Sequence, residues 1–253
     1  MGLALALFGI PSFLPLSSGF PRAFLIAMVI FVGAVAGRII ASVWAGKKIS
    51  SITSLLYQKA DPEDFIQKFN PILEHTPSNT IEYVDGTIKM AYACEALGRF
   101  DEGLKLLEKL KPGELHLHAL AGTALTENQK LRLYLLKEDT EAARTQIDTL
   151  QGLWETATGR APSLASNVKE CIRLAENWLN ALTGQPVDQA YLEEEIKLAG
   201  NDIHRSEMQL LLAKAMIFEN KTQEAKHLLS EAKRTGKGLY AETAAEELLG
   251  DLS

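Results

Sequence analysis

The sequence predicts an all-α protein in two parts, an apolar N-terminal segment (residues 1–46) and a domain of helical hairpins (residues 47–253). Residues 1–46 contain only two charged side chains, Arg22 and Arg38, whereas the rest of the 253-residue chain holds 24 basic and 32 acidic side chains. From Lys47 onward, apolar residues recur three and four positions apart in stretches of 10–16 residues, which is typical of amphipathic helices. Short turns separate these stretches, and no run alternates β-branched residues as a strand would.

The candidate membrane span is the apolar run at residues 23–46, AFLIAMVIFVGAVAGRIIASVWAG. As a helix these 24 residues would be roughly 36 Å long, against about 30 Å of bilayer hydrocarbon. Arg38 can extend to the interface, where Trp44 would lie in the aromatic belt. The start of the chain lacks the basic stretch and cleavage site of a secretory signal peptide. We therefore expect a retained transmembrane helix, with its main span at residues 23–45 in the lipid bilayer.

A second apolar run precedes this span, at residues 3–16. It is 14 residues long and contains Pro11 and Pro15, so it is short for a membrane helix. It could lie in the interface or form the first arm of a short hydrophobic hairpin. Basic residues are more numerous after the main span than before it, which places residues 47–253 in the cytoplasm by the positive-inside rule. We expect a cell-membrane protein with a cytoplasmic domain.

The domain begins with a predicted helix at residues 49–58, whose apolar face holds Ile52, Leu55 and Leu56. Asp61 then has the position of an N-cap, followed by Pro62 at the first helical position. The helix that follows has an apolar stripe and a predicted kink at Pro71. Its stripe consists of Phe65, Phe69, Ile72 and Leu73.

The clearest helical hairpin is predicted at residues 84–110. Gly98 should end its first helix, Phe100 should fill the corner, and the small Gly103 should let the second helix pack closely. Residues 207–235 repeat this order, with Thr222 in place of the corner aromatic. Looser hairpins are predicted at 131–150 and 174–199, and a capping helix at about 239–249.

The spacing of small and large residues in these hairpins resembles that of tetratricopeptide-repeat proteins. The resemblance covers residues 49–250, with two fair units and three degenerate ones, and implies an α-solenoid of antiparallel helical hairpins. The stretch LYQKADPEDF (residues 56–65) also resembles uncharacterised membrane-anchored repeat proteins of Gram-positive bacteria. The alternative is a helical-hairpin array or bundle without repeat ancestry.

No motif indicates catalysis, a cofactor or a metal, so we expect a protein that is not an enzyme. His116 and His118 are two positions apart and would point to different faces of a helix. Cys94 and Cys171 fit small buried side chains better than nucleophiles. Gly46-Lys47-Lys48 lacks both the leading glycine and the Ser or Thr of a phosphate-binding loop. The net charge of −8 on residues 47–253 argues against nucleic acid as a partner.

A binding surface remains the best functional hypothesis. The resemblance implies a concave face built from the first helix of each hairpin, which would bind a protein partner. In the two clearest units, the side chains expected there are Asp85, Ile88, Tyr92, Glu95, Glu207, Leu210, Lys214 and Ile217. The alternative is that the apolar members simply pack against the neighbouring hairpin.

These expectations predict a membrane-anchored scaffold or adaptor that mediates protein–protein interactions. A translocon- or envelope-associated chaperone, with its repeats outside the cytoplasm, is the main alternative. An enzyme with a site of unrecognised type is the third hypothesis.

Overall fold

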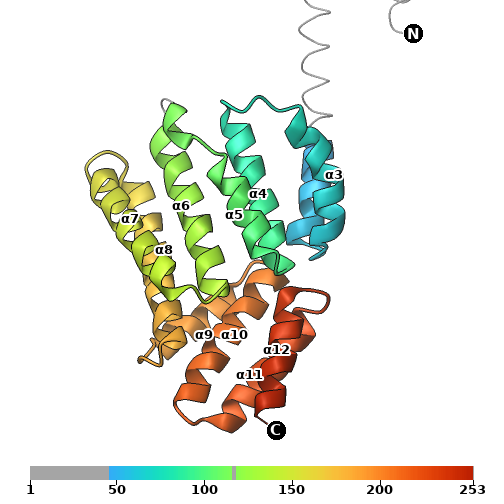
Figure 1. Ribbon diagram of the computed structural model, residues 1–253, viewed down its shortest axis with the longest axis vertical. Coiled ribbons are helices and arrows are strands. Elements are labelled where there is room, and N and C mark those ends of the chain that lie inside the picture. Colours follow the sequence, from blue (N-terminus) through green and yellow to red (C-terminus); the bar gives the residue numbers. More distant parts are fainter. Residues whose placement is uncertain (1–45, 116–117, 253) are drawn as a thin grey trace, which may run out of the picture. The chain divides into compact units, whose positions relative to one another are not determined.

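The computed structural model describes residues 46–115 and 118–252, and every regular element among them is helical (Figure 1). Residues 51–253 form one compact unit. Its first helix is part of a helical stretch at 46–57. The helices that follow are α3 (Pro62–Glu74), α4 (Ile81–Ala96), α5 (Phe100–Glu108), the 3-10 turn η2 (Pro112–Glu114), α6 (Ala119–Leu136), α7 (Thr140–Thr158), α8 (Pro162–Leu182), α9 (Gln189–Leu198), α10 (Asp202–Phe218), α11 (Thr222–Thr235) and α12 (Tyr240–Asp251).

The prediction of an all-α domain is therefore confirmed for the described residues. None of the helices within that part of the chain is both long enough and apolar enough to cross a bilayer. The predicted span at 23–45 and the apolar run at 3–16 lie outside the described residues.

Local signals set the helix starts as expected. The Asp61 carboxylate accepts a hydrogen bond from the Asp64 N–H, and Pro62 is the first helical residue of α3, which continues through Pro71. Four further helices begin with a side-chain cap of the same kind. The capping residues are Thr80 for α4, Asp139 for α7, Asp188 for α9 and Asn201 for α10.

Four turns between consecutive helices share one geometry. Gly98, Glu138, Gly184 and Asn220 each have a positive φ, between 60° and 72°, just after the C-cap of a helix. The next residue then donates its N–H to the carbonyl five positions earlier: Arg99 to Cys94, Asp139 to Tyr134, Gln185 to Asn180, and Lys221 to Met216. This is the 6→1 bond of a Schellman motif. The same backbone turn therefore connects α4 to α5, α6 to α7, α8 to α9, and α10 to α11, although only two of the four turns use glycine.

The corner residues Phe100 and Gly103 pack as the sequence predicts, but Phe100 contacts a helix that the sequence did not indicate. A Cβ atom at Gly103 would lie 3.3 Å from the Ala91 carbonyl oxygen and 3.1 Å from a Leu133 methyl, so this small residue does allow α5 to pack closely. The Phe100 ring contacts the Tyr240 ring edge to face, with centroids 4.9 Å apart. Tyr240 begins α12, the last helix of the chain.

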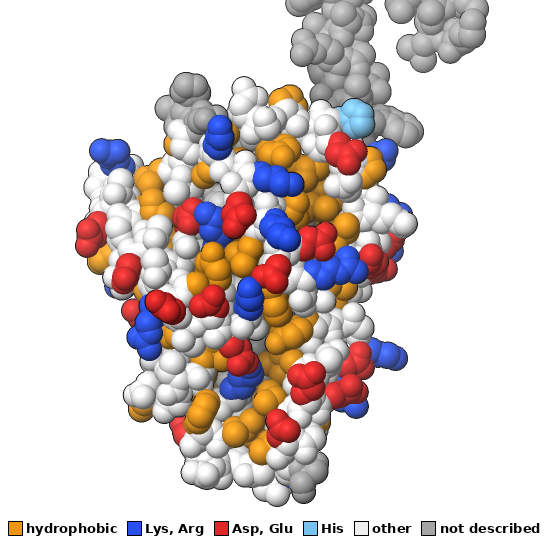
Figure 2. Space-filling model, in the orientation of Figure 1, with side chains coloured by type: hydrophobic (Ala, Val, Ile, Leu, Met, Phe, Trp, Pro, Cys, Tyr) orange, Lys and Arg blue, Asp and Glu red, His pale blue; other side chains and the backbone are white. Residues whose placement is uncertain are grey.

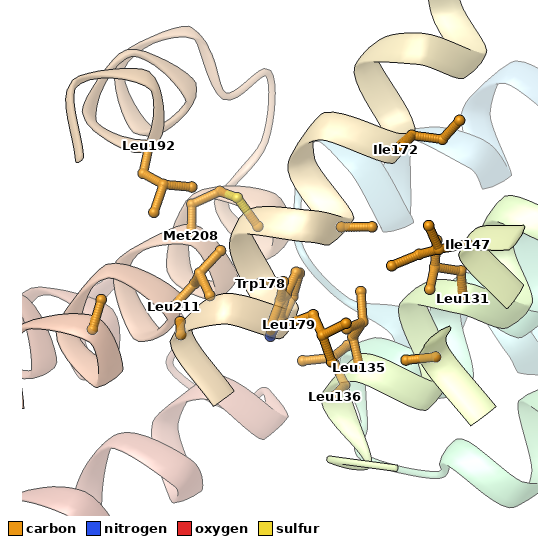
Figure 3. Packing of buried hydrophobic residues seen from close by; sticks show 14 of the residues in the cluster. Leu131, Leu135, Leu136, Ile147, Ile172, Trp178, Leu179, Leu192, Met208 and Leu211 are labelled. Carbon is orange, nitrogen blue, oxygen red and sulfur yellow. The ribbon is translucent and has the colours of Figure 1, made fainter. Parts of the chain in front are cut away.

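The alternate helices α4, α6, α8, α10 and α12 form an inner ring. Each contacts the next one in this series, and α12 also contacts α4. The array therefore curls until its last helix meets an early one. The space inside the ring is filled by side chains from α6, α8 and α10, including Leu135, Trp178 and Leu211 (Figure 3). A void of about 10 Å³ remains there, which is the size of one water molecule.

Candidate functional site

The structure encloses half of the predicted concave face. Tyr92, Glu95, Glu207 and Leu210 are at most 9% exposed. Asp85 is exposed, whereas Ile88, Lys214 and Ile217 are partly buried. The prediction of an open surface is therefore wrong for the four buried residues. The inner ring encloses them, because α12 returns to α4 and α10 packs on α8.

Three of these enclosed residues meet around one arginine that the sequence did not single out. Arg132 of α6 donates from Nη2 to Glu95 Oε1 of α4 at 2.5 Å and to Glu207 Oε2 of α10 at 2.6 Å. Its Nε also donates to Glu95 Oε1 at 3.1 Å. Gln129, one turn earlier on α6, donates to the other Glu95 oxygen at 2.5 Å. We call Glu95, Arg132 and Glu207 the buried triad; it joins three helices of the inner ring.

Aromatic rings cover one side of the triad. The Arg132 guanidinium lies 5.6 Å from the centre of the Tyr92 ring, which stacks on Tyr57 with centroids 5.8 Å apart. The Tyr92 hydroxyl donates to Asn201 Oδ1 at 3.2 Å, and this same oxygen caps α10. Tyr92 therefore links the helical stretch at 46–57, α4 and the start of α10.

The triad holds two carboxylates against one guanidinium in the interior. Burial raises the pKa of Glu207 to about 8, with Glu95 adding to the rise and Arg132 opposing it. Burial works against a charged Arg132, yet the two carboxylates hold its pKa well above the ordinary value. Burial, with Arg132, also lowers the pKa of the nearby His204 to about 4. A proton on Glu207 at neutral pH would leave the triad without net charge.

In this conformation the triad acts as a cross-link between helices. Glu95 is 0% exposed and Glu207 is 3% exposed, so a ligand in solvent reaches neither carboxylate. Among the described residues, no group of three or more His, Cys, Asp or Glu side chains is arranged to hold a metal ion.

An open groove lies elsewhere, on the outer face of α10 between α9 and α11. It has a volume of about 580 Å³. Its apolar residues are Ile196 of α9, Leu212 and Met216 of α10, and Leu228 of α11. Its polar residues are Glu193, Lys197, Gln223, Glu224 and His227. We call this the α9–α11 groove.

The groove exists because α10 is apolar on two faces. Glu207, Leu210 and Lys214 belong to the face that turns into the inner ring, whereas Leu212 and Met216 lie on the opposite side. The short helix α9 has ten residues, and between it and α11 a groove remains whose floor is formed by the buried Leu212 and Met216, 2% and 7% exposed.

The groove was not predictable from the hairpin pattern, because its wall residues Ile196 and Leu228 belong to two different predicted hairpins. The available signal was the run MQLLLAKAMIF, which is apolar around most of the helix and therefore needs partners on more than one side.

Charges of both signs are interspersed with apolar side chains on the face shown in Figure 2. Comparisons with protein-family models, with characterised proteins and with solved structures find no match for this chain. The class that the described residues themselves define is an all-α domain of packed helical hairpins, closed into a ring through α12 and α4.

Proposed function

We propose that this protein is a membrane-anchored helical-hairpin scaffold that holds a protein partner and performs no catalysis. The observation that carries the proposal is the α9–α11 groove, an open space of about 580 Å³ with the partly exposed Ile196 and Leu228 on its two walls. Concave apolar surfaces on helical arrays suit the binding of helical or extended segments. The apolar run at 23–45 supplies the anchor in this proposal.

A tetratricopeptide-like origin of the hairpins belongs to the same proposal. The turn shared by Gly98, Glu138, Gly184 and Asn220 supports descent from a repeated unit. The positive-φ positions 98, 138, 184 and 220 are 40, 46 and 36 residues apart, however, whereas tetratricopeptide units are about 34 residues long. The units would therefore be lengthened ones, and a hairpin array of other origin remains the competing explanation.

The anchor is tested by membrane fractionation of the full chain beside a variant that lacks residues 1–46. We expect the full chain to stay with membranes after carbonate washing and the deletion variant to be released. Circular dichroism of the deletion variant checks that it keeps its helices. Release of the full chain by carbonate would refute the transmembrane anchor.

A further inference from the structure

We propose that the α9–α11 groove binds a short amphipathic helix of a partner protein, one whose apolar stripe is flanked by lysine or arginine. This inference rests on the proposed scaffold function and specifies the chemistry of the partner.

The shape of the groove favours a helix of about three turns. The α9 wall has ten residues, which corresponds to roughly 15 Å of helix. Ile196 of α9 and Leu228 of α11 are partly exposed, whereas Leu212 and Met216 of α10 are buried, so a helix lying between the two walls would place its apolar stripe against Ile196 and Leu228. Such a helix would use apolar anchors spaced i, i+3, i+4 and i+7.

The charges on the two walls favour a basic partner. Glu193 lines the groove from α9 and Glu224 lines it from α11, and both side chains are exposed. Among the described residues neither carboxylate takes part in an ion pair, whereas Lys197 has Glu194 at 3.9 Å. A helix with lysine or arginine on each side of its apolar stripe would place a positive charge near each of these carboxylates. The charge of −8 on residues 47–253 would speed its association.

The same charges disfavour a lipid surface as the occupant. Anionic head groups attract basic patches, whereas this groove has the carboxylates of Glu193 and Glu224 beside one lysine, Lys197, and one histidine, His227. A second copy of the chain is a separate possibility, which the experiment below distinguishes.

The test uses the full chain in detergent micelles and two fluorescent 14-residue peptides. Both peptides have leucine at the i, i+3, i+4 and i+7 positions; lysine flanks the stripe in one and glutamate in the other. Fluorescence anisotropy gives the dissociation constants. We expect the lysine peptide to bind roughly tenfold more tightly than the glutamate peptide. The double variant Glu193→Lys/Glu224→Lys should abolish or reverse this preference.

The matched control is Glu155→Lys/Glu247→Lys, which changes the net charge equally at exposed positions outside the groove. It should keep the preference for the lysine peptide. Because all four positions are exposed, circular dichroism should show folded protein for both variants. Equal binding of the two peptides, or equal effects of the two double variants, would overturn the proposal.

Light scattering of the chain without peptide tests whether a second copy of the chain occupies the groove. Self-association that is lost in Glu193→Lys/Glu224→Lys but kept in the control would assign the groove to a second copy and overturn the proposal. If neither peptide binds, the groove is not a docking site and the scaffold function itself fails, whereas equal binding of both peptides refutes only the basic partner chemistry. The carbonate experiment tests the anchor separately.

Discussion

Arg132 on α6 and Glu207 on α10 are 75 positions apart in the chain, yet Arg132 Nη2 and Glu207 Oε2 lie 2.6 Å apart in the interior. The same guanidinium nitrogen binds Glu95 of α4. The Glu207 side chain is 4% exposed and that of Arg132 15% exposed, so water screens this contact weakly. The pair therefore couples the C-terminal hairpins to the middle of the array.

Removing the arginine should destabilise the fold strongly. Arg132→Met leaves Glu95 and Glu207 buried without a positive partner, and breaking a buried ion pair in this way costs about 3–5 kcal/mol. Urea unfolding followed by circular dichroism measures the loss. Lys137→Met is the matched control, because its pair with Asp101 is exposed and solvent screening leaves it little effect on stability. Equal losses in the two variants would contradict a buried triad.

Glu207 predicts a dependence of stability on pH. Its pKa is raised in the folded chain to about 8 from an ordinary value of 4.5, so the folded state binds more protons between these values and stability falls as pH rises. His204 acts in the opposite direction below pH 6.5, because its pKa is lowered to about 4. The effect of Glu207 on stability is therefore separated from that of His204 between pH 6.5 and 8.

In that window the wild type should lose stability on the order of 1 kcal/mol per pH unit. Glu207→Gln keeps the shape of a neutral carboxyl and should show a flatter profile. Urea unfolding at pH 6.5, 7.2 and 8 compares the two proteins. Parallel profiles would show that Glu207 does not carry the extra proton.

Substitution by alanine should have opposite effects on stability at two helical glycines. Gly103→Ala places a methyl 3.1 Å from Leu133 and 3.3 Å from the Ala91 carbonyl, so α5 must shift away from α4 and the protein should lose about 1–3 kcal/mol. Gly152 on α7 is exposed and has open space around it, so Gly152→Ala should stabilise the protein by up to about 1 kcal/mol. Thermal unfolding measures both changes, and a stabilising Gly103→Ala would refute the close contact.

The location of the domain can be tested by thiol labelling, provided that the native cysteines do not react with the label. Cys94 is 1% exposed and burial raises its pKa to about 12, so a maleimide should not modify it in the folded chain on either side of the membrane. Gly152→Cys in a Cys171→Ser background supplies an exposed thiol instead.

A cytoplasmic domain predicts that an impermeant maleimide modifies this thiol only after the cells are permeabilised. Modification in intact cells would favour the envelope-chaperone alternative. Labelling of the purified variant, beside the Cys171→Ser parent, confirms that the new thiol is reactive.

Local features of the fold were predictable because they depend on neighbouring residues. Asp61 and Pro62 indicate the start of α3, since a carboxylate cap and a fixed φ act within one helical turn. Gly98 indicates the end of the preceding helix because glycine adopts positive φ without strain. Glu138 and Asn220 have the same backbone conformation without being glycine, so their turns carried a weaker signal.

The candidate sites were less predictable because they depend on where distant helices meet. Periodicity, caps and turns were enough to predict the helical class, the acidic domain and the hairpin order. Long-range packing accounts for the rest: α12 returns to α4, Tyr92 and Glu95 are enclosed, and a groove lies between α9 and α11. A glutamate has the same local helix preference whether solvent or an arginine 37 positions away neutralises it, so periodicity cannot distinguish the two cases.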